Sequence, residues 1–176
     1  LPRSETLKRW PGVVTLGVVA ALGVVGSRAS LERERDDVEQ ALRASPTFFQ
    51  SEEAKATVAR HPGDAYLQLL LGTYAVSEGH PSSLRFVTRA LVLAPSWAQP
   101  HLLLARILAA GNRCSQALLE VREVLERTTT QATACAQAAL RLRPPPAREE
   151  LDRVAPRNLG GVSFLNGVAQ SAPTPE

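Results

Sequence analysis

The stretch that decides the fold is residues 64–127, DAYLQLLLGTYAVSEGHPSSLRFVTRALVLAPSWAQPHLLLARILAAGNRCSQALLEVREVLER. Apolar residues recur in it at helical spacing, and short breakers interrupt the pattern at residues 79–81, 94–96 and 111–112. The pattern predicts four helices, over residues 65–78, 82–93, 97–110 and 113–126. Connections of two or three residues place successive helices antiparallel. No stretch alternates with the two-residue period of a strand, so we predict an all-α fold.

A repeat underlies these helices. Pro62 and Pro95 lie 33 residues apart, and each follows a predicted helix and precedes a small cap and a leucine-rich helix. A period of 33 to 34 residues is typical of stacked helix hairpins. Two helices of a hairpin approach closely only where one presents a small residue to a large side chain of the other. The spacing therefore predicts hairpins that share an interior, with Leu70, Tyr74, Val87 and Ala117 among its members.

Both hairpins carry a pattern known from one family. The first has Leu67, Leu70, Leu71 and Tyr74 on one helix, then Ser83, Val87 and Ala90 on the next, and closes with Pro95. The second has Leu104, Ala105 and Leu108, a turn at Gly111, and then Ala117, Val121 and Val124. This pattern resembles the tetratricopeptide repeat (TPR) family. It departs from the family where Leu67 and His101 replace an aromatic residue, and the second repeat ends at Thr129 without a proline.

The resemblance implies an α-α superhelix of TPR-like hairpins over residues 30–142, with the best repeats at 64–96 and 97–129. Residues 47–60 resemble the second half of a preceding repeat, and residues 136–145 resemble the end of a following one. A prolyl run at residues 144–146 stops any helix. Residues 143–176 are therefore predicted to be a Pro-rich and flexible tail, apart from one short turn near residues 147–154.

An apolar run precedes the hairpins. Residues 10–27 are 18 consecutive uncharged residues, and as a helix they would extend roughly 27 Å, close to the thickness of the hydrocarbon core. Residues 1–9 form a basic flank that ends in Lys8 and Arg9, and Trp10 lies at the edge of the run. We predict a single-pass transmembrane helix, which places the protein in a membrane, by resemblance the bacterial inner membrane. A cleavable signal, with a site at residues 27–29, and a buried helix of a soluble bundle are the alternatives.

Length and composition limit the classes of function that this chain could have. The chain has 176 residues, about one domain, and 44% of them are hydrophobic, which is globular rather than disordered. Its net charge is +3, and beyond residue 27 acids and bases are interleaved. Phosphate binding needs a basic surface of one sign, so nucleic acid is not an expected partner. The side of the membrane stays open, because basic residues near the two ends of the run are nearly balanced.

Catalytic and metal-binding motifs are not found in the sequence. His61, His80 and His101 are scattered, and Cys114 and Cys135 are 21 residues apart without a Cys-x-x-Cys element. We interpret both cysteines as small buried side chains, with a disulfide left open for an oxidising compartment. No phosphate-binding glycine loop or nucleophile elbow is present. We therefore expect no metal, no cofactor and no enzymatic activity in this chain alone.

Stacked hairpins leave a concave face lined by the first helix of each repeat. The predicted protein-binding residues on that face are Gln68, Val76, Gln99, Leu102 and Arg106. Arg106 would pair with an acidic group of an extended peptide. The leading interpretation is a membrane-anchored TPR-like interaction or scaffold domain that binds another protein. The alternatives are the C-terminal TPR region of a larger polytopic membrane protein, such as an O-antigen-ligase-like enzyme, and a secreted soluble TPR protein after signal cleavage.

Overall fold

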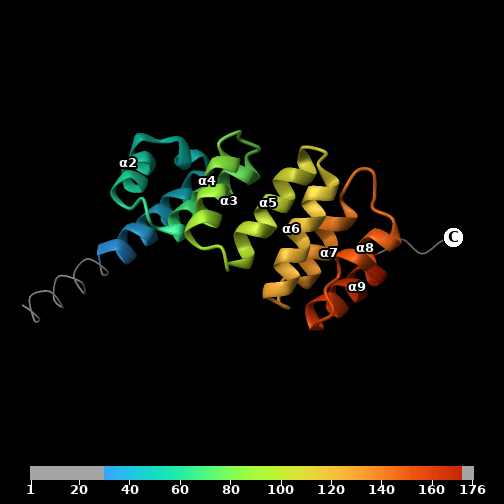
Figure 1. Ribbon diagram of the computed structural model, residues 1–176. Helices are drawn as coiled ribbons and strands as arrows, with labels where there is room; N and C mark the ends of the chain where they lie inside the picture. Colours follow the sequence, from blue (N-terminus) through green and yellow to red (C-terminus); the bar gives the residue numbers. More distant parts are fainter. Residues whose placement is uncertain (1–29, 172–176) are drawn as a thin grey trace, which may run out of the picture. The chain divides into compact units, whose positions relative to one another are not determined.

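The protein is all-helical. A computed structural model describes residues 30–171, and this part contains no strand (Figure 1). After a helix over residues 30–44, the elements are η2 Pro46–Gln50, α2 Glu52–Arg60, α3 Ala65–Ser77, α4 Ser83–Leu93, α5 Ala98–Ala110, α6 Cys114–Arg127, α7 Ala132–Leu140, α8 Arg148–Val154 and α9 Leu159–Ser171. The four helices predicted within residues 64–127 are confirmed, with bounds that differ by no more than one residue.

Contacts divide the chain into two units, Leu1–Ala44 and Ser45–Glu176. The predicted transmembrane segment, residues 10–27, and its basic flank lie outside the described residues. Among residues 30–171, no helix combines the length and the apolar character that crossing a membrane requires. The hairpins and every site described below belong to the second unit.

Side chains and backbone turns fix where the helices begin and end. The Ser51 hydroxyl accepts the amide N–H of Ala54 at 3.0 Å, and Asp64 Oδ1 accepts the amide N–H of Tyr66 at 2.9 Å, so each residue caps the helix that follows it. The cap at Asp64 confirms the predicted start of the first hairpin.

The two main hairpins share their turn geometry. Gly79 and Asn112 have positive φ angles of 63° and 57°, and they lie 33 residues apart. Each turn also has a backbone hydrogen bond between residues five apart in the chain. The amide N–H of His80 donates to the carbonyl oxygen of Ala75 at 2.8 Å, and that of Arg113 donates to the carbonyl oxygen of Leu108 at 2.9 Å. Glycine and asparagine are the residues that adopt this left-handed conformation most readily. The 33-residue spacing in the sequence is thus repeated in the backbone.

α3 packs against α4, α5 packs against α6, and α4 packs against α5 (Figure 1). α3 approaches α4 closely at Gly72, where an added Cβ would lie 3.0 Å from Val87 Cγ2. The predicted common interior of Leu70, Tyr74, Val87 and Ala117 is wrong. Val87 and Ala117 are buried, but only Ala117 belongs to the core that extends from α5 to α9, and Leu70 and Tyr74 are only half-buried. The buried residues of α3 include Leu67, Leu71 and Ala75 as well as Gly72, which contacts α4.

A third helix pair follows. α7 packs against α9, and an added Cβ at Gly167 would lie 3.1 Å from the Ala136 Cβ. Phe164 of α9 and Leu151 of α8 are buried in the core that α5, α6 and α7 share. The sequence predicts a flexible tail from residue 143 with one short turn near residues 147–154. α8 confirms that turn, and α9 corrects the prediction for residues 159–171. The physical reason is that Phe164 has a core to enter and the glycines of α9 permit close packing.

Candidate functional site

A groove lies between α5 and α7. Its α5 wall consists of Leu102, Arg106, Ala109 and Ala110, and its α7 wall of Ala134, Gln137, Ala138 and Arg141. On each helix these residues follow the three- and four-residue spacing of a single face. The groove has a volume of about 390 Å³, and four of its eight lining residues are alanines, which we call the alanine floor. The two walls come from helices that are not consecutive in the chain but are in direct contact.

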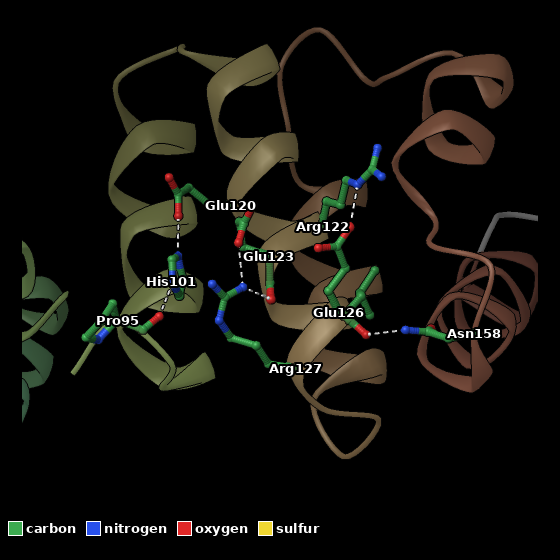
Figure 2. Close-up of polar contacts among 9 residues, drawn as sticks. Pro95, His101, Glu120, Arg122, Glu123, Glu126, Arg127 and Asn158 are labelled. Atoms are coloured by element: carbon green, nitrogen blue, oxygen red, sulfur yellow. Dashed lines mark hydrogen bonds and ion pairs between the residues drawn. The ribbon is translucent and has the colours of Figure 1, made fainter.

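The charged residues of the groove have one sign. Arg106 and Arg141 are exposed, and none of the lining residues is acidic. Among residues 30–171, neither guanidinium has a hydrogen bond or an ion pair. Two arginines of α6 are paired instead: Arg122 contacts Glu126 at 2.8 Å and Arg127 contacts Glu123, each one helical turn away (Figure 2). The groove therefore offers cationic groups that the described part of the protein does not neutralise.

A polar bridge fixes the helix that forms one wall. Nδ1 of His101 lies 2.7 Å from Oε2 of Glu120 on α6, and Nε2 lies 3.2 Å from the carbonyl oxygen of Pro95 (Figure 2). Both neighbours are acceptors, and the tautomer decides which ring nitrogen carries the N–H that donates to one of them. The His101 side chain is 12% exposed and that of Glu120 is 23% exposed. The bridge joins α5 to α6 and to the preceding loop, one turn before Arg106.

A second hollow of about 350 Å³ lies at the other end of α5. Trp97 and Gln99 line it together with residues around Thr128 and Gln131. The Trp97 residue is 40% exposed there. This hollow includes no acid and one arginine, Arg127, which is already paired with Glu123.

The five predicted binding residues do not form one surface. Leu102 and Arg106 meet in the α5–α7 groove, although Leu102 is only 7% exposed. Gln99 lines the second hollow, and Val76 is half-buried on α3. Gln68 is 5% exposed, so it has almost no surface to offer a partner. Gln68 precedes Gly72 by one helical turn, so both lie on the same buried face of α3.

Sequence reasoning missed the α7 half of the groove. Ala134, Gln137 and Arg141 lie in a segment whose alanine-rich pattern resembles only the end of a repeat. The 33-residue period is the signal that could have found it. Adding 33 to residue 105 of α5 gives residue 138, so the period predicts the first helix of a third hairpin around residue 138. The sequence around residues 132–140 lacks the large residues that make such a helix conspicuous.

The two cysteines differ in burial. The Cys114 thiol donates to the carbonyl oxygen of Arg143 at 3.1 Å, and Cys135 is fully buried. Both are free thiols. Burial raises the pKa of the Cys135 thiol to about 12, which keeps the reactive thiolate scarce. Within the described residues, no group of three or more metal-ligating side chains comes together.

Comparisons with known proteins leave the class open. No protein-family model, curated protein or solved structure matches the chain.

Proposed function

We propose that this chain is a TPR-like interaction module, in which an α-α superhelix of hairpins binds a segment of another protein in the groove between α5 and α7. The main support for the proposal is the groove. Its walls are two contacting helices from successive hairpins, and the exposed guanidinium groups of Arg106 and Arg141 line it. The 33-residue repetition of the turns at Gly79 and Asn112 supports the TPR-like arrangement. Peptide recognition in such a groove needs no catalytic residue.

A site-specific photocrosslinker tests this function in cells that make the full chain. Gln137 lies in the groove, and Gln116 is an exposed residue of α6 outside it. We expect a discrete crosslinked partner from position 137 and none of the same size from position 116. Filling the groove by Ala110→Trp should abolish this product, whereas Ala56→Trp on the exposed surface of α2 should preserve it. Equal crosslinking from both positions, or a product that survives Ala110→Trp, would refute binding in the groove.

The membrane anchor belongs to the same proposal. Residues 10–27 supply an uninterrupted uncharged run with basic and aromatic residues at its start. A spanning helix resists alkaline carbonate, which releases peripheral proteins. We expect the full chain to stay in the membrane pellet after a carbonate wash and a variant with Val18→Arg and Leu22→Arg to be released. Release of the unaltered chain would refute the anchor and leave the groove proposal standing.

A further inference from the structure

The α5–α7 groove also indicates which kind of protein segment it accepts. We infer that its occupant is a short, extended acidic segment, whose carboxylates pair with Arg106 and Arg141 and whose small or apolar side chains lie on the alanine floor. This inference rests on the protein-binding function proposed above and adds the chemistry of the partner.

The charge distribution is the first argument. The chain as a whole mixes acids and bases, but α5 and α7 contain no acidic residue along their entire lengths. Arg106 and Arg141 are the two charged residues of the groove, and within residues 30–171 neither has a side-chain partner. An arginine guanidinium presents several N–H donors in a flat array that matches a carboxylate in two-point contact. Two such groups in one acid-free groove favour an anionic partner over a neutral or basic one.

The dimensions are the second argument. The lining residues extend from residue 102 to 110 on α5 and from 134 to 141 on α7. At about 1.5 Å per residue, each wall is roughly 10 to 12 Å long. An extended chain advances about 3.3 Å per residue, so the groove holds some three to four residues of a peptide. A folded domain could not enter it, whereas a short linear segment fits its length.

The floor is the third argument. Ala109, Ala134 and Ala138 have no side-chain atom beyond Cβ, so the groove is open to another main chain and to small apolar groups. Arg106 follows Leu102 by one turn, and Arg141 is the C-cap of α7 at the end of its wall. Two carboxylates of the segment would each reach one of the two guanidinium groups. The small or apolar residues between these carboxylates would contact the alanines.

Peptide arrays and titrations test the inference with the full 176-residue chain. The probes are eight-residue peptides of alanine and leucine that carry two glutamates at every pair of positions, and matched peptides with glutamine instead. We expect a subset of glutamate peptides to bind and their glutamine counterparts to bind at least tenfold more weakly, because charge-assisted hydrogen bonds are lost. Arg106→Gln and Arg141→Gln should each weaken binding about tenfold, with a larger loss in the double variant.

Arg148→Gln is the matched control, because Arg148 is exposed at the start of α8 and outside the groove. It should leave binding within about twofold of the unaltered chain, since isolated surface charges are screened by salt. Equal weakening by Arg148→Gln would show nonspecific attraction and overturn the inference. So would equal binding of the glutamate and glutamine peptides, or no binding by any peptide.

Two further arms separate the possible failures. If the crosslinked partner of position 137 is unchanged by Arg106→Gln and Arg141→Gln, protein binding stands and the acidic segment is wrong. If Ala110→Trp also leaves that partner unchanged, the proposed function fails as well. Vesicles of phosphatidylglycerol test a lipid headgroup as the anion. Arginine-dependent binding to these vesicles without binding to any peptide would replace the acidic segment with a membrane surface.

Discussion

Gly72 determines how closely α3 and α4 pack. An added Cβ there would lie 3.0 Å from Val87 Cγ2 and 3.3 Å from the Phe86 Cβ, and both neighbours are buried. Gly72→Leu should therefore lower the free energy of unfolding by about 1 to 3 kcal/mol through overpacking, measured by urea denaturation. Combining it with Val87→Ala should cost less than the sum of the two single changes, because the shorter side chain makes room.

Gly63 supplies the control, because no atom lies within 4 Å of an added Cβ and its φ is not positive. Gly63→Ala should leave stability unchanged or raise it by up to about 1 kcal/mol, since it restricts the unfolded chain. If Gly72→Leu proved as well tolerated, the close approach of α3 and α4 at this point would be wrong.

Cys135 makes stability depend on alkaline pH. Its thiol has an ordinary pKa of 9.0, and burial raises that pKa to about 12 in the folded protein. The folded state thus holds the proton more tightly, so this contribution is fully present below pH 9 and is lost as pH rises toward 12. At pH 10 the loss should be about 1 kcal/mol. Unfolding curves of the unaltered chain and of Cys135→Ala should converge by that amount between pH 8 and 10, and parallel curves would contradict the prediction.

At the scale of elements, α9 shows where sequence reasoning reached its limit. The paired glycines at 160 and 161 indicate a flexible segment when only local preference is considered. In the structure they permit contact instead: an added Cβ at Gly160 would lie 2.5 Å from the Leu125 carbonyl oxygen of α6. Local pattern predicted α3 to α6 because large apolar residues mark their faces. It missed α7 and α9 as a pair, because small residues define their interface and small residues also occur in loops.

The groove shows the same limit. Arg106 was predicted because α5 is conspicuous, whereas Arg141 belongs to an alanine-rich helix whose place depends on tertiary packing. Gln68 was predicted as a surface residue because the rotation of α3 cannot be determined from a helix that is apolar on nearly all sides. Which face of such a helix is buried depends on the helices packed against it. Here the face with Gly72 packs against Phe86 and Val87 of α4.

Asn158 ties α9 to α6. Its Oδ1 accepts the amide N–H of Gly161 at 2.9 Å and caps the helix, and its Nδ2 donates to the Leu125 carbonyl oxygen at 3.2 Å (Figure 2). Asn158→Ala should lower the free energy of unfolding by about 1 to 2 kcal/mol, because both bonds are lost. Asn158→Ser keeps a cap acceptor and loses the bond to α6, so its cost should be about half. Equal costs of the two variants in chemical denaturation would mean that the bond to α6 alone matters and that the cap contributes nothing.

At the scale of the molecule, the packing contacts predict graded rather than uniform stability. The substantial contacts of the second unit join elements that are close in the chain, and one core of buried residues extends from α5 to α9. The α3–α4 hairpin buries its own set, which includes Leu71, Phe86 and Val87. Because the packing contacts are mainly local, a substitution at one end of the unit should destabilise the other end less.

Phe164→Ala removes a fully buried ring from the C-terminal end of this core. It should cost about 3 to 5 kcal/mol and raise amide hydrogen exchange in α7 and α9 about a hundredfold or more, with a smaller rise in α5 and the least in α3 and α4. Phe86→Ala should produce the opposite gradient, since its ring belongs to the α3–α4 hairpin. Hydrogen exchange resolved by helix measures both variants. A rise of equal size in every helix would mean that the unit unfolds as one cooperative body, and local contacts would then not govern its stability.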